Sequence, residues 1–192
     1  MADRYEFRCW DDDFAPQAAI LESDWMPLGE ERSRETYLLG GTDRFSLKIR
    51  DGRFEVKEKL KTEGMLELWR PVAGIAFPLS MDELAPWLEQ AFGLGGAATQ
   101  GGEDVEEQAL PALLARHGVG QALVVEKHRR RYGLAGVLAE HVAVAAAGRH
   151  LQCVAAEGEE PSLLFTGLRL LHVEERENLA YPARLLQLVN PG

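Results

Sequence analysis

Residues 44–60 read Arg-Phe-Ser-Leu-Lys-Ile-Arg-Asp-Gly-Arg-Phe-Glu-Val-Lys-Glu-Lys-Leu, and they predict a β-hairpin. Asp51-Gly52 lies between two arms of alternating apolar and polar residues. Both residues tolerate the positive φ that a type I′ turn requires. In the resulting register Arg50 pairs with Arg53, and Lys48 pairs with Glu55. Because partners across a ladder share a face, the hairpin has one polar face and one apolar face.

The polar face of this hairpin has an unusual charge. It carries Arg44, Ser46, Lys48, Arg50, Arg53, Glu55, Lys57 and Lys59. Like charges repel by about 1 kcal/mol per pair at 4 Å even in bulk water, so this excess of cations requires anions nearby. Two interpretations follow from the stretch alone. The face either lies in solvent, where Lys and Arg guard a sheet against edge pairing, or it binds a polyanion.

The whole chain is acidic, although this hairpin is basic. It has 192 residues and a net charge of −10, from 21 basic and 31 acidic residues. The length suits a single domain over residues 1–192 with a substantial core. The acidic total argues against unspecific binding to nucleic acid or to membranes, which requires a basic exterior. A basic pocket inside an acidic shell selects small, strongly charged anions instead, and the oligomeric state stays open.

The cysteines and the N-terminus indicate the cellular compartment. Cys9 and Cys153 are too few and too far apart for a disulfide framework or a CxxC metal site, so we expect reduced thiols. The N-terminus lacks the apolar stretch of a signal peptide, and no apolar run reaches membrane-spanning length. We therefore expect a cytoplasmic location.

The periodicity of the remaining chain predicts further strands and helices. Beside the hairpin, strands are expected at residues 4–10, 31–39, 64–70, 121–132, 135–146 and 149–159. Helices are expected at residues 14–22, 80–92, 104–117, 161–172 and 181–189. The glycine-rich residues 93–102 are the one predicted linker. Strands in groups with helices inserted between them indicate an α+β fold with an antiparallel sheet or barrel.

Two of these strands carry further charged residues at every second position, so that the residues of each set lie on one face of their strand. Lys127, Arg129 and Arg131 share one face of the strand at 121–132. Cations of matching parity therefore come from three separate strands. In the strand at 149–159, Glu157 and Glu159 share a face and are expected to project side by side.

The order of these segments resembles the CYTH domain, also called the triphosphate tunnel family, over nearly the whole chain. Leu47-Lys48-Ile49-Arg50 is similar to the family's basic LRIR segment, and residues 54–59 are similar to its WELTLK strand. Lys127-His128-Arg129 resembles its KxR strand. Residues 156–159, Ala-Glu-Gly-Glu, resemble its late ExE strand, and residues 178–181, Asn-Leu-Ala-Tyr, resemble its closing Asn-Lys-Ser-Tyr segment.

The N-terminal motif departs from this family. Where the family has ExExK, residues 6–10 read Glu-Phe-Arg-Cys-Trp, so Arg8 replaces the second Glu and Trp10 replaces the Lys. The family also has an acidic residue on the strand before ExE, and residues 141–145 supply none. An arginine among carboxylates either repels a metal or replaces it by contacting phosphate with two hydrogen bonds.

The resemblance implies an eight-stranded antiparallel β-barrel whose tunnel binds a small anion: a triphosphate, a polyphosphate or a nucleotide. It also implies Mg²⁺ or Mn²⁺ held by carboxylates, which polarises the phosphoryl group and orients water. The phosphate-binding residues predicted on this basis are Arg8, Lys48, Arg50, Lys57, Lys59, Lys127, Arg129 and Arg131. The predicted metal ligands are Glu6, Glu157 and Glu159, and no catalytic residue is predicted.

Three functions remain open at this point. The first is a metal-dependent triphosphatase or polyphosphatase. The second is a non-catalytic binder of a phosphorylated ligand that has lost the metal chemistry, and the altered N-terminal motif favours it. The third is an interaction module whose basic interior is structural. The five histidines show no HExxH or paired spacing. Among them His141, on a strand face expected to point into the tunnel, is the strongest candidate for a role.

Overall fold

The computed structural model describes residues 2–40, 42–95 and 104–190, so most of the predicted linker at 93–102 lies outside the described residues. The described residues form the strands β1 (Arg4–Asp11), β2 (Met26–Leu39), β3 (Phe45–Arg50), β4 (Arg53–Glu63), β5 (Leu66–Ala76), β6 (Gln121–Leu134), β7 (Val137–Ala146) and β8 (Arg149–Gly158). They also form the helices α1 (Ala15–Asp24), α2 (Met81–Phe92), α3 (Ala109–His117), α4 (Pro161–Leu170) and α5 (Tyr181–Val189).

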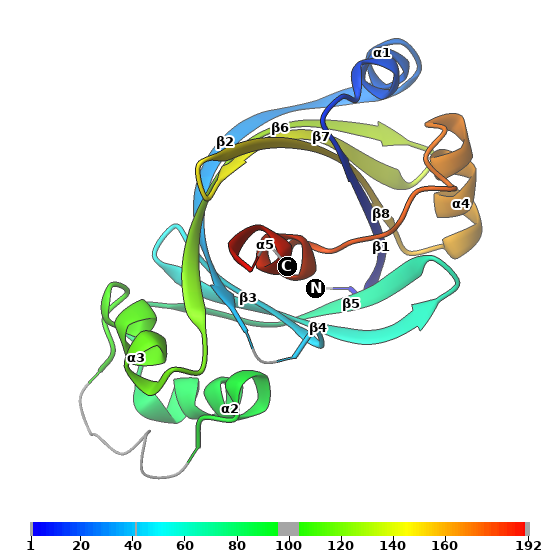
Figure 1. The fold of residues 1–192 in the computed structure, drawn as a ribbon. Helices are drawn as coiled ribbons and strands as arrows, with labels where there is room; N and C mark the ends of the chain where they lie inside the picture. The colour runs from blue at the N-terminus through cyan, green and yellow to red at the C-terminus, as the bar shows by residue number, and fades with distance from the viewer. Residues whose placement is uncertain (1, 41, 96–103, 191–192) are drawn as a thin grey trace.

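The strands close into one barrel in the order β1-β5-β4-β3-β2-β6-β7-β8. All neighbouring pairs are antiparallel. Figure 1 shows this ring end-on, with α2 and α3 on one side and α1 and α4 on the other. The α+β class and the eight-stranded antiparallel barrel expected from the sequence are confirmed.

The central hairpin forms in the predicted register. Asp51 and Gly52 both have positive φ, 52° and 67°, as a type I′ turn requires. Arg50 lies opposite Arg53, and Lys48 lies opposite Glu55. Because the side-chain period of a strand is two, this register places the polar residues of both arms on one face, except Glu58, which lies opposite Phe45 on the apolar face.

The apolar face of the hairpin points away from the barrel axis. Its residues form a core with α2 and α3 that includes Phe45, Leu47, Ile49, Phe54, Val56, Leu84, Leu88, Leu110 and Leu114. Ser80 caps the N-terminus of α2 through a capping box, and Gly93 ends the helix in the left-handed conformation. Each buried side chain of this kind stabilises the fold by about 1.5–3 kcal/mol. The helices therefore leave the polar face of the hairpin to line the inside of the ring.

The two ends of the barrel differ. At one end α5 packs on side chains that point inward from β2, β6, β7 and β8; these residues are Tyr37, Leu39, Val125, Val142, Val144 and Leu151. In Figure 1 α5 accordingly lies within the outline of the ring. The opposite end carries the turns at Asp51-Gly52 and Ala135-Gly136. We call it the open mouth. None of the helices in the described part of the chain has the length and apolar character needed to span a bilayer.

Candidate functional site

A cavity of about 500 Å³ lies inside the barrel, between α5 and the open mouth. Predicted phosphate-binding residues from four strands line it together: Arg8, Lys48, Arg50, Lys57, Lys127, Arg129 and Arg131. Lys59 does not line the cavity. Its ammonium group contacts Asp43 at 2.6 Å and Glu67 at 3.3 Å instead.

The deepest charges of the cavity surround Glu35 of β2. Its carboxylate is fully buried and contacts Lys127 Nζ at 2.7 Å, Lys48 Nζ at 3.3 Å and the Arg129 guanidinium. Burial by itself raises the pKa of Glu35, but the charges of these three cations outweigh burial and hold the pKa well below its usual range. Lys127 also donates to Tyr37 Oη at 2.7 Å. Glu35 therefore stays ionised and fixes three of the predicted phosphate-binding cations.

Two further carboxylates hold cations nearer the mouth. Glu55 contacts Lys48 at 3.2 Å and Arg50 at 2.9 Å. Burial raises the pKa of Glu55, but Lys48 and Arg50 outweigh it, so the pKa is lowered. Glu31 contacts the guanidinium groups of Arg129 and Arg131 at 3.3 and 3.6 Å. Each predicted phosphate-binding cation at this end thus already has an internal anion.

A row of carboxylates crosses three neighbouring strands. In the register Glu6 of β1 lies opposite Glu67 of β5 on one side and opposite Glu157 of β8 on the other. All three line the cavity. Lys57 contacts Glu6 at 2.6 Å, and Arg4 contacts Glu157 at 2.8 Å. Two carboxylates of the row are therefore already paired with cations, Lys57 of β4 and Arg4 of β1.

The predicted side-by-side pair of Glu157 and Glu159 is wrong. Strand β8 ends at Gly158, so Glu159 leaves the ladder and lies exposed outside the tunnel cavity. Among the described residues, no three His, Cys, Asp or Glu side chains come together as a metal site. Hard divalent cations require several free oxygen ligands. Because Glu6 and Glu157 are engaged by Lys57 and Arg4, the present arrangement does not fit Mg²⁺ or Mn²⁺.

The two departures from the ExExK motif both contact the segment that leads into α5. Arg8 is largely buried and donates to Cys153 Sγ at 3.0 Å, and its guanidinium lies 4.4 Å from the centre of the Tyr181 ring. Trp10 packs edge-on against the same ring, with centroids 5.0 Å apart, and donates its indole N–H to the Leu179 carbonyl at 2.7 Å. The residues at these two motif positions therefore anchor the closing helix.

Sequence reasoning missed four acidic residues in or beside the cavity: Glu31, Glu35, Glu67 and Glu140. Glu35 shares the face of Glu31 and Tyr37 in β2, and this parity was the signal that could have found it. Glu140 of β7 lines the cavity and lies 3.6 Å from Arg8. The strand before ExE thus does supply an acidic residue, one position before the segment considered from the sequence.

The expectation that His141 points into the tunnel is also wrong. Its ring nitrogens contact Arg130 at 2.8 Å and Gln152 at 2.9 Å, and all three side chains belong to the outer face of the barrel. The reason is parity: Glu140, the neighbour of His141, faces inward, and successive side chains of a strand point to opposite faces.

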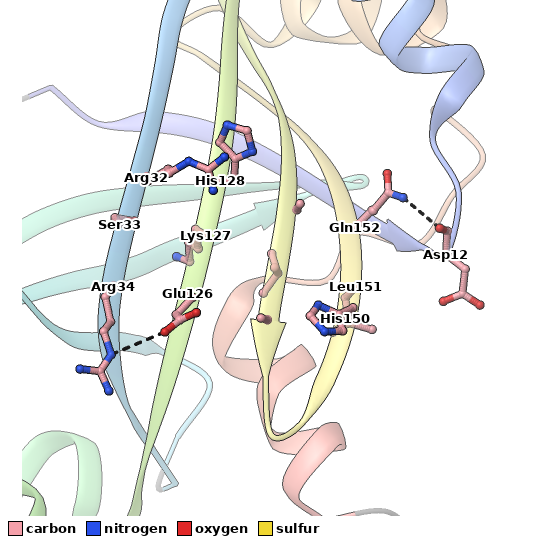
Figure 2. A pocket seen from close by; sticks show the side chains of 13 residues that line it. Asp12, Arg32, Ser33, Arg34, Glu126, Lys127, His128, His150, Leu151 and Gln152 are labelled. Carbon is pink, nitrogen blue, oxygen red and sulfur yellow. Dashed lines mark hydrogen bonds and ion pairs between the residues drawn. The ribbon is translucent and has the colours of Figure 1, made fainter.

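A larger hollow of about 660 Å³ lies on the outside of the barrel, over β2, β6, β7 and β8 (Figure 2). The small side chains of Ala143 and Ala145 border it. Arg34 and Glu126 form an ion pair beside this hollow, with 3.9 Å between their charged groups, and a dashed line marks it in Figure 2. Both side chains are about two-thirds exposed, at 72% and 67%. Exposed pairs of this kind are weak, so the concentration of buried charge makes the inner cavity the stronger candidate for a functional site.

Comparison with known proteins identifies the fold. No protein-family model matches the chain, and no curated protein matches it. Among solved structures, the PH1012 protein of Pyrococcus horikoshii OT3 is 17% identical with a TM-score of 0.57, over 97% of this chain and 99% of that one. A conserved hypothetical protein of Pyrococcus furiosus is 14% identical with a TM-score of 0.54, over 93% and 98%.

A third similar structure carries a described activity. HpAC1 from Hippeastrum, proposed as an adenylyl cyclase and described as having a dominant triphosphatase activity, is 12% identical with a TM-score of 0.52, over 95% of this chain and 94% of that one. At such identities the likeness concerns the fold alone. Together with the closed barrel of eight antiparallel strands, it shows that the chain has a CYTH-like, triphosphate tunnel fold.

Proposed function

We propose that the barrel binds a triphosphate, or a comparable small polyanion such as a polyphosphate or a nucleotide, and that its own cations do so without a divalent metal. The observation that carries this proposal is the convergence of Lys and Arg side chains from β1, β3, β4 and β6 on one cavity of about 500 Å³. Charge-assisted hydrogen bonds to phosphate are roughly twice as strong as neutral ones. The Hippeastrum protein, which has the same fold, adds support for a triphosphate.

The internal carboxylates determine how such a ligand binds. Eight cations and six carboxylates line the cavity, so the cations are largely neutralised before a ligand arrives. Lys57 and Arg131 are the ones that exchange partners, since their side chains are 40% and 46% exposed. A phosphate group displaces Glu6 and Glu31 from them and offers more acceptor oxygens. The cations around Glu35 stay paired and provide a fixed positive wall.

A thermal-shift and calorimetry experiment tests this proposal. Tripolyphosphate in the presence of EDTA should raise the melting temperature, because a ligand that binds only the folded state stabilises it. Lys57→Ala combined with Arg131→Ala should weaken binding at least tenfold. The matched control is Lys61→Ala with Arg34→Ala, which removes two exposed cations that do not line the cavity. No shift in the wild type, or equal loss in the control, would overturn the proposal.

The row of Glu67, Glu6 and Glu157 favours one second candidate, metal-dependent hydrolysis of the bound phosphate chain. This function requires Lys57 and Arg4 to release their carboxylates when ligand binds. Phosphate release from tripolyphosphate or a nucleoside triphosphate should then depend on Mg²⁺ or Mn²⁺ and disappear in Glu6→Gln. Glu159→Gln tests the third predicted ligand in the same assay. Absence of turnover with either metal would remove this candidate.

A further inference from the structure

At the open mouth, one inward-facing residue from each of five neighbouring strands forms a row. These residues are apolar on some strands and acidic on others. The register runs from Met26 of β2 to Gly133 of β6, Leu138 of β7, Glu157 of β8 and Glu6 of β1. Cross-strand partners share a face, and Glu157 and Glu6 line the tunnel cavity. This row is therefore apolar on β2, β6 and β7, and acidic on β8 and β1.

A β-bulge adds a second apolar side chain to this part of the mouth. The pairing of β2 with β6 shifts register between Pro27 and Gly29, so Leu28 is the extra residue. Gly29 has a φ of 117°, a conformation that glycine readily adopts. A Cβ atom on Gly133 would lie 3.2 Å from Leu28 Cδ1, so the leucine covers the inward side of this glycine. The bulge and the missing side chain together place Leu28 over the mouth.

These apolar side chains are exposed and border one hollow of about 600 Å³. Met26 is 62% exposed, Leu28 is 42% exposed and Leu163, from the first turn of α4, is 42% exposed. Leu138 borders the same hollow. We call Met26, Leu28, Leu138 and Leu163 the mouth patch. Contiguous exposed apolar surface marks a binding site, whereas a single exposed apolar residue does not.

The mouth patch is continuous with the phosphate-binding cavity. Leu138 borders both the hollow and a small space that it shares with Arg8 and Glu140, and these two residues also line the tunnel. The ion pair between Arg4 and Glu157 lies at the boundary, with Arg4 on the hollow and Glu157 on the tunnel. A molecule whose phosphates contact the tunnel cations thus has the patch within reach of its other end.

We propose that the ligand of the tunnel is a triphosphate ester of an apolar organic group, and that this group lies on the mouth patch. The inference rests on the proposed function and narrows it. Inorganic tripolyphosphate leaves the patch in water, whereas an alkyl group removes it from water, and this transfer is favourable. Arg131 lines the tunnel and lies two positions before Gly133 on the same face of β6, so one ligand with an anionic end and an apolar end contacts both the cations and the patch.

A pair of synthetic esters with the same charge tests the inference. Octyl triphosphate and methyl triphosphate are titrated into the full chain by calorimetry in EDTA, with octyl ester below its micelle concentration. We expect the octyl ester to bind at least tenfold more tightly than the methyl ester, a difference of about 1.4 kcal/mol. The methyl ester should bind like tripolyphosphate.

Surface variants then locate the octyl group. Leu28→Ser combined with Leu163→Ser should reduce the tenfold difference to less than threefold and leave the affinity for the methyl ester unchanged. The matched control is Val124→Ser with Leu170→Ser, because these residues are 40% and 48% exposed and do not border the hollow. All four residues are partly exposed, so the variants should fold.

The outcomes separate this inference from the proposed function. Equal affinities for the two esters, with clear binding of both, overturn the inference and leave the proposed function standing. Binding of neither ester overturns both. A tenfold difference that persists in the patch variant places the octyl group elsewhere and overturns the inference. A ligand-free dimer that only the patch variant dissociates assigns the patch to a second copy of the chain, which also overturns it.

Discussion

Glu35 near the closed end of the barrel and Glu6 near the open mouth each contact a lysine, and they differ in how much water reaches the pair. The Glu35 and Lys127 side chains are 0% and 1% exposed, whereas Glu6 and Lys57 are 24% and 40% exposed. Water competes for the charges of the second pair and not for those of the first. The comparison indicates that the closed end uses charge to fix the structure and that the mouth uses it to exchange partners with a ligand.

Glu35→Gln should have the largest effect on stability. The substitution leaves Lys127, Lys48 and Arg129 without their shared carboxylate, and breaking a buried ion pair in this way costs about 3–5 kcal/mol. Urea denaturation measures the free energy of unfolding. The matched control is Glu31→Gln, whose side chain is 34% exposed and which should cost less than about 1 kcal/mol. Equal losses of unfolding free energy in the two variants would show that ion pairs at the closed end and at the mouth contribute equally to stability.

The pH dependence of stability should report the same buried carboxylate. The pKa of Glu35 is lower in the folded state than in the unfolded state, where it is about 4.3. Its contribution is therefore complete above this value and declines as the pH falls, because the unfolded chain takes up the proton first. The stability gap between wild type and Glu35→Gln should shrink by up to about 1.4 kcal/mol per pH unit below pH 4.3. A constant gap between pH 7 and pH 3 would contradict this.

Lys57→Ala should separate binding from stability at the mouth. Its pair with Glu6 is partly exposed, so the free energy of unfolding should fall by less than about 1 kcal/mol. The affinity for tripolyphosphate should fall about tenfold, because a charge-assisted hydrogen bond to phosphate is lost. Calorimetry and urea denaturation on the same variant give both numbers. A large loss of stability with unchanged affinity would make Lys57 a structural residue like Lys127.

Arg34→Ala, on the outer face, should have the smallest effect. Its pair with Glu126 is 3.9 Å long and about two-thirds exposed. We expect a change in unfolding free energy below about 0.5 kcal/mol and no change in tripolyphosphate affinity. An effect on binding comparable to that of Lys57→Ala would show that the outer hollow of Figure 2 also contributes to the site.

The sequence by itself determined the local features of this protein. Asp51-Gly52 fixed the hairpin register, since only a turn with two positive φ values fits two residues between these arms. Strand parity then placed Lys48 and Lys57 on one face and Lys127 and Arg129 on one face. The sequence also predicted the antiparallel barrel through its resemblance to the CYTH family. The hairpin register and the strand parity depend on neighbours within a few residues, where the physical rules are short-ranged, whereas the barrel was predicted from the resemblance alone.

Only the tertiary structure decided which residues the charged faces of the strands contact. Lys127 and Glu35 are 92 positions apart in the sequence, and they became partners because the barrel closed with β2 beside β6. The end of β8 at Gly158 excluded Glu159 from the tunnel, and the bulge at Leu28 opened the mouth patch. The reason is that period-two patterning distinguishes two faces of a strand but not their surroundings. The helices that cover the outside of the ring, together with the closure of the ring, determine which face of a strand is buried under a helix and which face lines the tunnel.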